Sequence, residues 1–236
     1  MSERYARQIS LIGEAGQKKL SESTVFVAGA GGLGSPVLFY LASAGIGNLR
    51  IADLDKVDES NLNRQILHST DRLGVSKAES AKLTLSALNP EINITAFTEK
   101  IDDRSVSRIT GDADIIVDCM DNFEARYVLN RFSHEKDTAL VHGAVSGFSG
   151  QATLIVPDKT PCLSCIFPNA VTSEKTPVFG FTAGVIGSIE AGEAIKYLTG
   201  EGNTLAGKLL VYDGRVNSFD VFSVKKSSKC KVCGKK

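Results

Sequence analysis

Three glycines in the stretch TVFVAGAGGLG, residues 24–34, have the spacing G-x-G-x-x-G. Gly29 permits a tight turn, Gly31 lets the backbone approach a phosphate, and Gly34 lets a helix pack against a strand. Unpaired N–H groups at the start of that helix attract an anion. Asp53 directly follows the next apolar run, residues 48–52. A carboxylate at the end of this second strand can hold a ribose hydroxyl. The pattern predicts a nucleotide-binding site.

Charged side chains beyond the predicted strands favour one class of nucleotide. NAD carries two phosphate charges, which a helix terminus largely satisfies, whereas ATP carries about four and needs added cations and a metal. Arg64 follows the second strand, Lys77 opens the next helix, and Asp121 ends the fourth apolar run with a carboxylate suited to Mg²⁺. Because a lysine in the first turn opposes the helix dipole, we expect an anion near Lys77. Together these residues favour a triphosphate.

Two C-x-x-C pairs offer four thiolates, from Cys162, Cys165, Cys230 and Cys233. Four thiolates suit a tetrahedral zinc ion, if the chain returns to bring the pairs together. A redox dithiol is the alternative for one pair, but it requires a thioredoxin-like setting that this sequence lacks. The spacing therefore predicts a zinc site.

The composition excludes several classes of protein. Hydrophobic residues make up 42% and charged residues 23%, which is ordinary for a soluble globular protein. Lysine plus arginine equals aspartate plus glutamate at 27 each, so nucleic acid is not an expected partner. No apolar stretch approaches the roughly 20 residues that cross a bilayer, and the start MSERYARQIS is no signal peptide. We expect a cytosolic protein without a membrane partner. In that compartment we expect the cysteines to bind a metal or take part in catalysis rather than to form disulfides.

Alternating strands and helices must position these residues. The patterns predict strands at 24–28, 48–52, 91–99 and 113–122, two more within 138–157, and helices at 33–45, 75–89, 103–109 and 124–136. This alternation predicts a doubly wound, Rossmann-like α/β fold with a mainly parallel sheet. A loop (166–182), a long helix (183–200) and two strands that extend the sheet antiparallel (208–213 and 217–224) are expected after it.

Seven motifs lie along the chain: RYARQ, GAGGLGSP, DLDKVDESNLNRQ, GVSKAESA, DCMDN, the two C-x-x-C pairs and VIGSIEAGEAIKYLTG. Together they resemble, in order and spacing, the ThiF, MoeB and HesA family of adenylyltransferases, relatives of the E1 enzymes that activate ubiquitin. The resemblance implies one adenylation domain over residues 1–236. Its parts are a helical N-terminal segment (1–23), a nucleotide-binding core (24–157) and a zinc-pinned, carrier-binding part with a crossover loop (158–236).

The resemblance also implies an activity. In that family, ATP and Mg²⁺ serve to adenylate the C-terminal glycine carboxylate of a small ubiquitin-like sulfur-carrier protein, for thiocarboxylate formation in thiamine, molybdopterin or related sulfur transfer. An attacking carboxylate needs no general base, so the chemistry can run on charge neutralisation alone. His68, His134 and His142 are isolated in sequence, and we expect them to be structural.

Individual site residues follow from the same resemblance. Arg7 matches an arginine that reaches the phosphates of the other subunit, which implies a homodimer with two sites. Arg7, Arg64, Lys77 and Asp121 carry the catalytic roles, Asp121 also holds Mg²⁺, and the zinc is structural and does not contact ATP. The positions matching the nucleotide site are Gly29, Gly31, Gly32, Gly34, Asp53, Ser60, Asn61, Leu62, Asn63, Arg64, Gln65, Lys77, Asp121 and Asn122.

One departure concerns the loop at residues 166–182. Many relatives place a cysteine there that binds the activated carrier covalently, and the matching position in this chain is Ser173. The remaining thiol, Cys119, lies within an apolar run and is most simply a buried core residue. We therefore expect adenylation without a covalent sulfur intermediate, the acyl-adenylate passing to an external sulfide or persulfide donor.

Three alternatives stay open from the sequence. An NAD-dependent oxidoreductase explains the first strand, turn and helix but leaves Arg64, Lys77 and the four cysteines without roles. A non-catalytic binding protein uses the same fold as a scaffold. Adenylation of a peptide or of another small carboxylate acceptor keeps the chemistry and changes the substrate.

Overall fold

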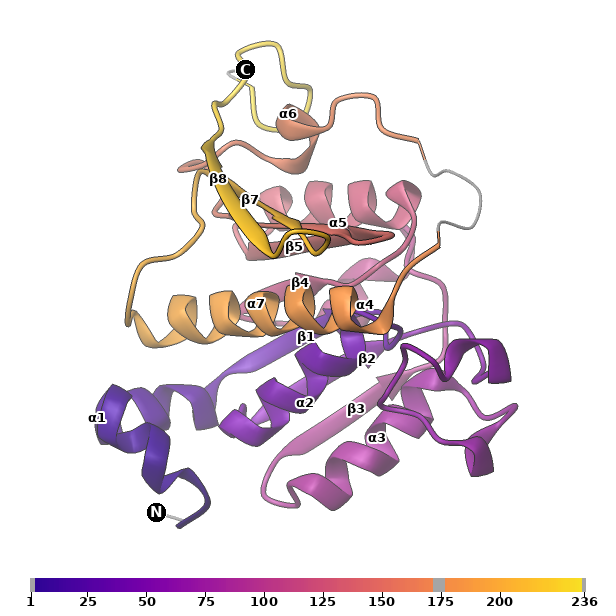
Figure 1. The fold of residues 1–236 in the computed structure, drawn as a ribbon. Coiled ribbons are helices and arrows are strands. Elements are labelled where there is room, and N and C mark those ends of the chain that lie inside the picture. Colours follow the sequence, from indigo (N-terminus) through magenta and orange to yellow (C-terminus); the bar gives the residue numbers. More distant parts are fainter. Residues whose placement is uncertain (1–2, 172–176, 235–236) are drawn as a thin grey trace.

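The computed structural model describes residues 3–171 and 177–234 and has one central eight-stranded sheet (Figure 1). The strand order is β3-β2-β1-β4-β5-β6-β7-β8. The first five strands in this order are parallel, and the last three extend the sheet antiparallel. This is the predicted architecture.

The regular elements follow one another in the alternating order expected of this fold. The strands are β1 (Thr24–Ala28), β2 (Asn48–Ala52), β3 (Asn93–Phe97), β4 (Ile115–Asp118), β5 (Ala139–Ser146), β6 (Ser149–Ile155), β7 (Lys208–Asp213) and β8 (Ser218–Ser223). The helices are α1 (Ala6–Glu22), α2 (Gly34–Ala44), α3 (Lys77–Leu88), α4 (Val106–Thr110), α5 (Phe123–Glu135), α6 (Leu163–Ile166) and α7 (Gly180–Thr199). Among these described helices, none has the length and apolarity that crossing a bilayer requires.

Several elements are shorter or longer than the sequence pattern predicts. β3 covers five residues where the pattern suggested nine, because its register with β2 pairs only those five. β4 ends at Asp118, whose carboxylate accepts a hydrogen bond from the Met120 N–H, so Asp121 lies in a turn and not in the strand. α7 begins at Gly180, three residues earlier than predicted, and the short α6 was not predicted.

The sheet buries both faces of its parallel strands. Val25 and Val27 of β1 point into a core formed with α2, α3 and α7, while Phe26 and Ala28 point into a second core formed with α4, α5 and α6. Figure 1 shows α2 and α7 on one side of the sheet and α5 on the other. Burial on both faces explains why the central strands are continuous apolar runs.

The register of the parallel strands brings three strand ends together. Ala28 pairs with Ala52 of β2 and with Asp118 of β4, so the turns that follow β1, β2 and β4 start side by side. In such sheets the crevice beyond the carboxyl ends is where ligands bind. α1 lies at the opposite edge, where Gln17 donates a hydrogen bond to the Ala44 carbonyl at the end of α2.

Candidate functional site

The turn after β1 is built by close backbone contact. Gly29 has a φ of 98°, and a Cβ there would lie 2.9 Å from the Cys119 carbonyl oxygen. A Cβ on Gly34 would collide with the Gly29 carbonyl oxygen. α2 therefore starts directly against the turn, and its N-cap residue, Leu33, offers no side-chain acceptor to the first N–H groups. Free N–H groups at a helix start are suited to a phosphate.

Asp53 stands beside this turn, as the sequence predicts for a ribose-binding acid. Its Oδ2 accepts a hydrogen bond from the Ala30 N–H at 2.8 Å, and its Oδ1 accepts one from the Asp55 N–H at 2.9 Å. Burial raises the pKa of the Asp53 carboxyl, and the positive charge of Lys77 opposes that rise. Each carboxylate oxygen has a second lone pair, which can accept from a ribose hydroxyl.

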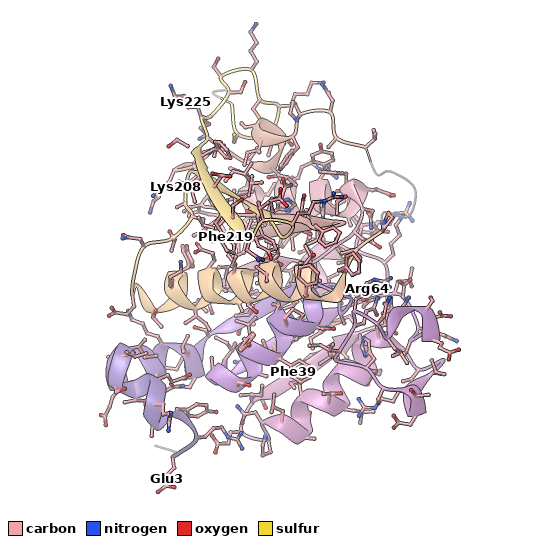
Figure 2. All side chains as sticks on the ribbon, in the orientation of Figure 1. Glu3, Phe39, Arg64, Lys208, Phe219 and Lys225 are labelled. Carbon is pink, nitrogen blue, oxygen red and sulfur yellow. The ribbon has the colours of Figure 1, made fainter. Side chains whose placement is uncertain are left out.

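Arg64 and Gln65 lie over the glycine turn. A Cβ built on Gly32 would be 3.7 Å from Arg64 Cγ, and one on Gly31 would be 3.6 Å from Gln65 Nε2. Arg64 Nη1 donates to the Ser60 carbonyl at 3.0 Å, a hydrogen bond that joins the two ends of the predicted 60–64 segment. Figure 2 shows Arg64 beside the start of α7. The structure thus brings this segment to the predicted site.

Lys77 is a buried cation with an acidic partner. The residue is only 6% exposed, and its Nζ lies 2.9 Å from Asp55 Oδ2. The anion expected near this lysine is therefore present, in the form of Asp55. The Asp55 side chain is 68% exposed, so the pair joins a buried cation to a solvated anion. Ser76, the residue before α3, makes no side-chain capping hydrogen bond.

Asp121 is exposed in the turn between β4 and α5. Asn122 caps α5 by accepting a hydrogen bond from the Ala125 N–H at 2.9 Å, and its Nδ2 donates to Asp121 Oδ1 at 3.2 Å. The neighbouring Met120 sulfur would lie 3.5 Å from a Cβ on Gly29, so the two turns adjoin. An exposed carboxylate next to a phosphate site fits Mg²⁺, which is commonly bound by one or two carboxylates together with phosphates.

Arg7 lies away from the site of its own chain. It is an exposed residue of α1, at the edge of the sheet opposite the glycine turn. Figure 2 shows Glu3, just ahead of α1, and Arg64 at well separated places. A contact between Arg7 and a nucleotide therefore requires a second subunit, as the resemblance implies.

His68 is a buried structural residue, as the sequence analysis expects, and it supports the glycine turn. Its Nε2 lies 2.8 Å from the Ala30 carbonyl oxygen and its Nδ1 lies 2.9 Å from Ser80 Oγ. Burial lowers the pKa of His68, so the imidazole is neutral, and since a carbonyl only accepts, Nε2 carries the proton. His68 thus holds the backbone between Gly29 and Gly31. Nothing in its sequence context indicates this long-range contact.

The four predicted cysteines form one cluster. The Cys162 and Cys230 sulfurs lie 3.5 Å apart, those of Cys165 and Cys233 lie 3.3 Å apart, and all four are within 4.8 Å of one another. A tetrahedral ion with bonds of about 2.3 Å to sulfur separates its ligands by about 3.8 Å. The four thiols therefore fit a metal ion.

The two remaining sequence expectations about sulfur chemistry have different outcomes. Cys119 is buried at 7% exposure, and burial raises the pKa of its thiol well above the usual value, which confirms it as a core residue. Ser173 lies outside the described residues.

The close approach at the glycine turn predicts the effect of a single methyl group. Gly34→Ala should weaken ATP binding at least tenfold, because the new Cβ must displace the Gly29 carbonyl. Isothermal titration with ATP measures this loss. Gly192→Ala is the matched control, since a Cβ there meets nothing within 4 Å, and it should keep ATP affinity while stabilising α7 by up to ~1 kcal/mol. Unchanged affinity in Gly34→Ala would show that the turn does not hold the nucleotide.

The cysteine cluster predicts one bound metal ion per chain. Elemental analysis of the purified protein should find it, and Cys230→Ser should lose it and lower the melting temperature, because a metal bound to folded thiolates stabilises the fold. ATP affinity should stay within about twofold, since the cluster shares no residue with the glycine turn. Full metal content in Cys230→Ser would exclude the four-cysteine site.

Comparison with known proteins agrees with this geometry. The ThiF family model matches residues 5–232. The SAMP-activating enzyme E1 of Haloferax volcanii is 41% identical over 240 residues, covering 98% of this chain and 88% of that protein. The sulfur carrier protein adenylyltransferase of Thermus thermophilus is 38% identical over 245 residues, covering 98% and 90%. A crystal structure of E. coli MccB with ATP superposes with a TM-score of 0.89 at 25% identity, covering 99% of this chain and 75% of that one. This chain belongs to the ThiF family.

Proposed function

We propose that this protein is a Mg²⁺- and ATP-dependent adenylyltransferase that joins AMP to the C-terminal glycine carboxylate of a ubiquitin-like sulfur-carrier protein. The observation that carries the proposal is the gathering of Arg64, Lys77 and Asp53 around a glycine turn in a chain of this family. The names of the Haloferax and Thermus relatives support a carrier protein as the acceptor. The product would enter thiocarboxylate formation in thiamine, molybdopterin or related sulfur transfer.

The proposed reaction is a displacement at the α-phosphorus of ATP. A carboxylate oxygen of the carrier forms the new P–O bond, the bond to the bridging oxygen breaks, and pyrophosphate leaves. Both reactants are anions, so the main task of the site is to neutralise phosphate charge and to align attacking and leaving groups. The carboxylate is already ionised near neutral pH, so no general base is required. Magnesium, held by Asp121 with Asn122 beside it, would add positive charge on the phosphates.

Lys77 would bind the phosphates by exchanging the Asp55 carboxylate for a phosphate oxygen. A buried ammonium needs a counter-charge, and Asp55 supplies it while the nucleotide is absent. Because the Asp55 carboxylate is largely exposed, it can turn to water when a phosphate oxygen takes its place. Arg64 donates to the neutral oxygens of Ser60 and Asn63, so its charge stays available for phosphate.

The sulfur atom would come from outside this protein. The loop at residues 166–182 contains no cysteine, and Cys119 is buried as a protonated thiol. Neither offers a nucleophile for a covalent link to the carrier. The acyl-adenylate would therefore pass to an external sulfide or persulfide donor.

Two complete sites would require a homodimer. Arg7 cannot serve its own chain from α1, but the same residue of a second copy can reach the phosphates across an interface. An apolar groove of about 720 Å³ between α2, α7 and β8 supports such an interface. Large apolar side chains exposed along it are Tyr40, Ile66, Phe181 and Phe219.

The same proposal divides the chain into three working parts within one domain. Residues 1–23 supply the arginine to the other subunit, residues 24–157 bind the nucleotide, and residues 158–236 bind the carrier. A zinc ion at the four cysteines would pin this last part. We place the protein in the cytosol, where free thiols such as Cys119 stay reduced.

A peptide or another small carboxylate is the second candidate acceptor. The similarity to crystal structures of E. coli MccB with MccA, at a TM-score of 0.88 and 26% identity in one case, favours keeping it. The NAD-dependent oxidoreductase has no comparable support, because the Haloferax and Thermus relatives are named for activation and adenylyl transfer.

Pyrophosphate release tests the acceptor. Mixing the protein with ATP, Mg²⁺ and candidate carriers should release pyrophosphate, and deleting the carrier's last glycine should abolish the release. Lys77→Ala should lower kcat/KM by at least about 100-fold, because one charge-stabilising group at a developing anion is worth that much. Lys82→Ala, an exposed lysine on the same helix, is the matched control and should keep full activity. Unchanged release with the truncated carrier would reject its C-terminus as the acceptor.

Mixed dimers test the shared site. Arg7→Ala and Asp121→Asn should each be inactive alone. After subunit exchange, every mixed dimer has one site with the intact Asp121 of one subunit and the intact Arg7 of the other, so about a quarter of wild-type activity should return. Lack of recovery, with exchange verified by mass spectrometry, would place Arg7 and Asp121 in the same site of one chain, whereas full activity of Arg7→Ala alone would remove Arg7 from the mechanism.

A further inference from the structure

A buried polar cluster lies directly behind the turn that carries Asp121. It consists of Asp118 at the end of β4, Arg126 on α5 and His142 on β5, which are 0%, 5% and 0% exposed. His142 Nδ1 lies 2.7 Å from Asp118 Oδ2, and Arg126 Nε lies 3.8 Å from the same oxygen. The proposed reaction uses none of these three groups directly.

The cluster binds both backbone polar groups of one turn residue. Asp118 Oδ1 accepts a hydrogen bond from the Met120 N–H at 3.1 Å, and Arg126 Nη2 donates to the Met120 carbonyl. The same Nη2 donates to the Gly143 carbonyl at 3.1 Å, which anchors the arginine to β5. Met120 is therefore held from both sides, immediately before Asp121.

Charge balance makes this arrangement dependent on Arg126. Burial lowers the pKa of His142 and raises the pKa of Glu190, which packs against Gly143 and whose carboxyl has no hydrogen-bond partner among the described residues. Both are therefore neutral, and Arg126 is left as the counter-charge of Asp118. Removing one member of such a buried pair leaves the other uncompensated.

The turn is also fixed to the nucleotide side of the sheet. The Cys119 N–H donates to the Ala28 carbonyl at 2.9 Å, at the end of β1. Gly29 follows Ala28, so of the two residues that precede Asp121, Cys119 connects to the glycine turn and Met120 to the buried cluster. A carboxylate that must meet a metal and a phosphate together needs this kind of restraint.

We propose that Arg126 and Asp118 are positioning residues, which act through Met120 to hold the Asp121 carboxylate where a divalent cation bound to the nucleotide can reach it. This inference rests on the proposed function, because it takes Asp121 as the magnesium-binding acid. The restraint is built on side chains that contact neither nucleotide nor metal. Outer partners of this kind alter metal affinity by about 10- to 100-fold when they are replaced.

Manganese binding provides the test, with a readout separate from turnover. Electron paramagnetic resonance would follow Mn²⁺ binding to the whole protein saturated with α,β-methylene-ATP. Arg126→Gln should weaken Mn²⁺ binding at least tenfold, and Arg126→Lys, which keeps the charge but cannot contact Asp118 and both carbonyls, should fall between it and wild type. Arg126→Lys also keeps the test open should the glutamine variant fail to fold.

Asn130→Ala is the matched control. Asn130 lies on the same helix as Arg126 and is fully buried. Its side chain accepts a hydrogen bond from the Leu163 N–H and donates one to Ser164 Oγ, and neither partner belongs to the turn that carries Asp121. It should lower the melting temperature while Mn²⁺ binding stays within about twofold of wild type. Equal weakening in Asn130→Ala would show a general loss of stability and overturn the inference.

Asp121→Asn separates the two hypotheses. Weak Mn²⁺ binding in Asp121→Asn, with normal binding in both Arg126 variants, would overturn the positioning role and leave the proposed function intact. Normal Mn²⁺ binding in Asp121→Asn would remove Asp121 from the metal site, and the inference would fall with it.

Discussion

The structure depends on how closely the start of α2 approaches the end of β1. Gly34 packs on the Gly29 carbonyl, where no side chain fits, and this contact sets where the helix starts. The strand register then determines the rest, because Ala28 pairs with Ala52 and with Asp118. Acids that follow β2 and β4 therefore lie at one edge of the sheet, although they are far apart in the sequence.

Buried cations at this edge are paired in two different ways. Lys77 is buried, but its partner Asp55 is exposed, so the partner can leave when a stronger anion arrives. Arg126 and Asp118 are both buried, and the acid of this pair is fully shielded from water. The same electrostatic attraction thus gives an exchangeable pair at the proposed phosphate position and a permanent one behind the proposed metal position. Differences in solvent exposure, and not in residue type, separate the two roles.

Local patterns predicted most of the fold and part of the site. The parallel core, the glycine turn and Asp53 follow from apolar periodicity and from glycine spacing, which are properties of neighbouring residues. His68 on the Ala30 carbonyl, Asp55 on Lys77 and Arg126 on Met120 could not be predicted, since each contact is set by packing between elements. The predicted end of β4 was wrong because Cys119 and Met120 continue its apolar run, while the Met120 N–H donates a hydrogen bond to the Asp118 side chain and the backbone turns.

The cysteine cluster closes a long loop of the chain. Cys162 and Cys230 are 68 positions apart, and the closed segment includes α7, β7 and β8. A metal ion held by the four thiolates would cross-link the chain over this length and remove conformational entropy from the unfolded state, worth roughly 4 kcal/mol by analogy with a disulfide. Little of that benefit would depend on the packing of the enclosed residues. With such an ion bound, the surface of this segment could vary in sequence with a smaller risk of unfolding.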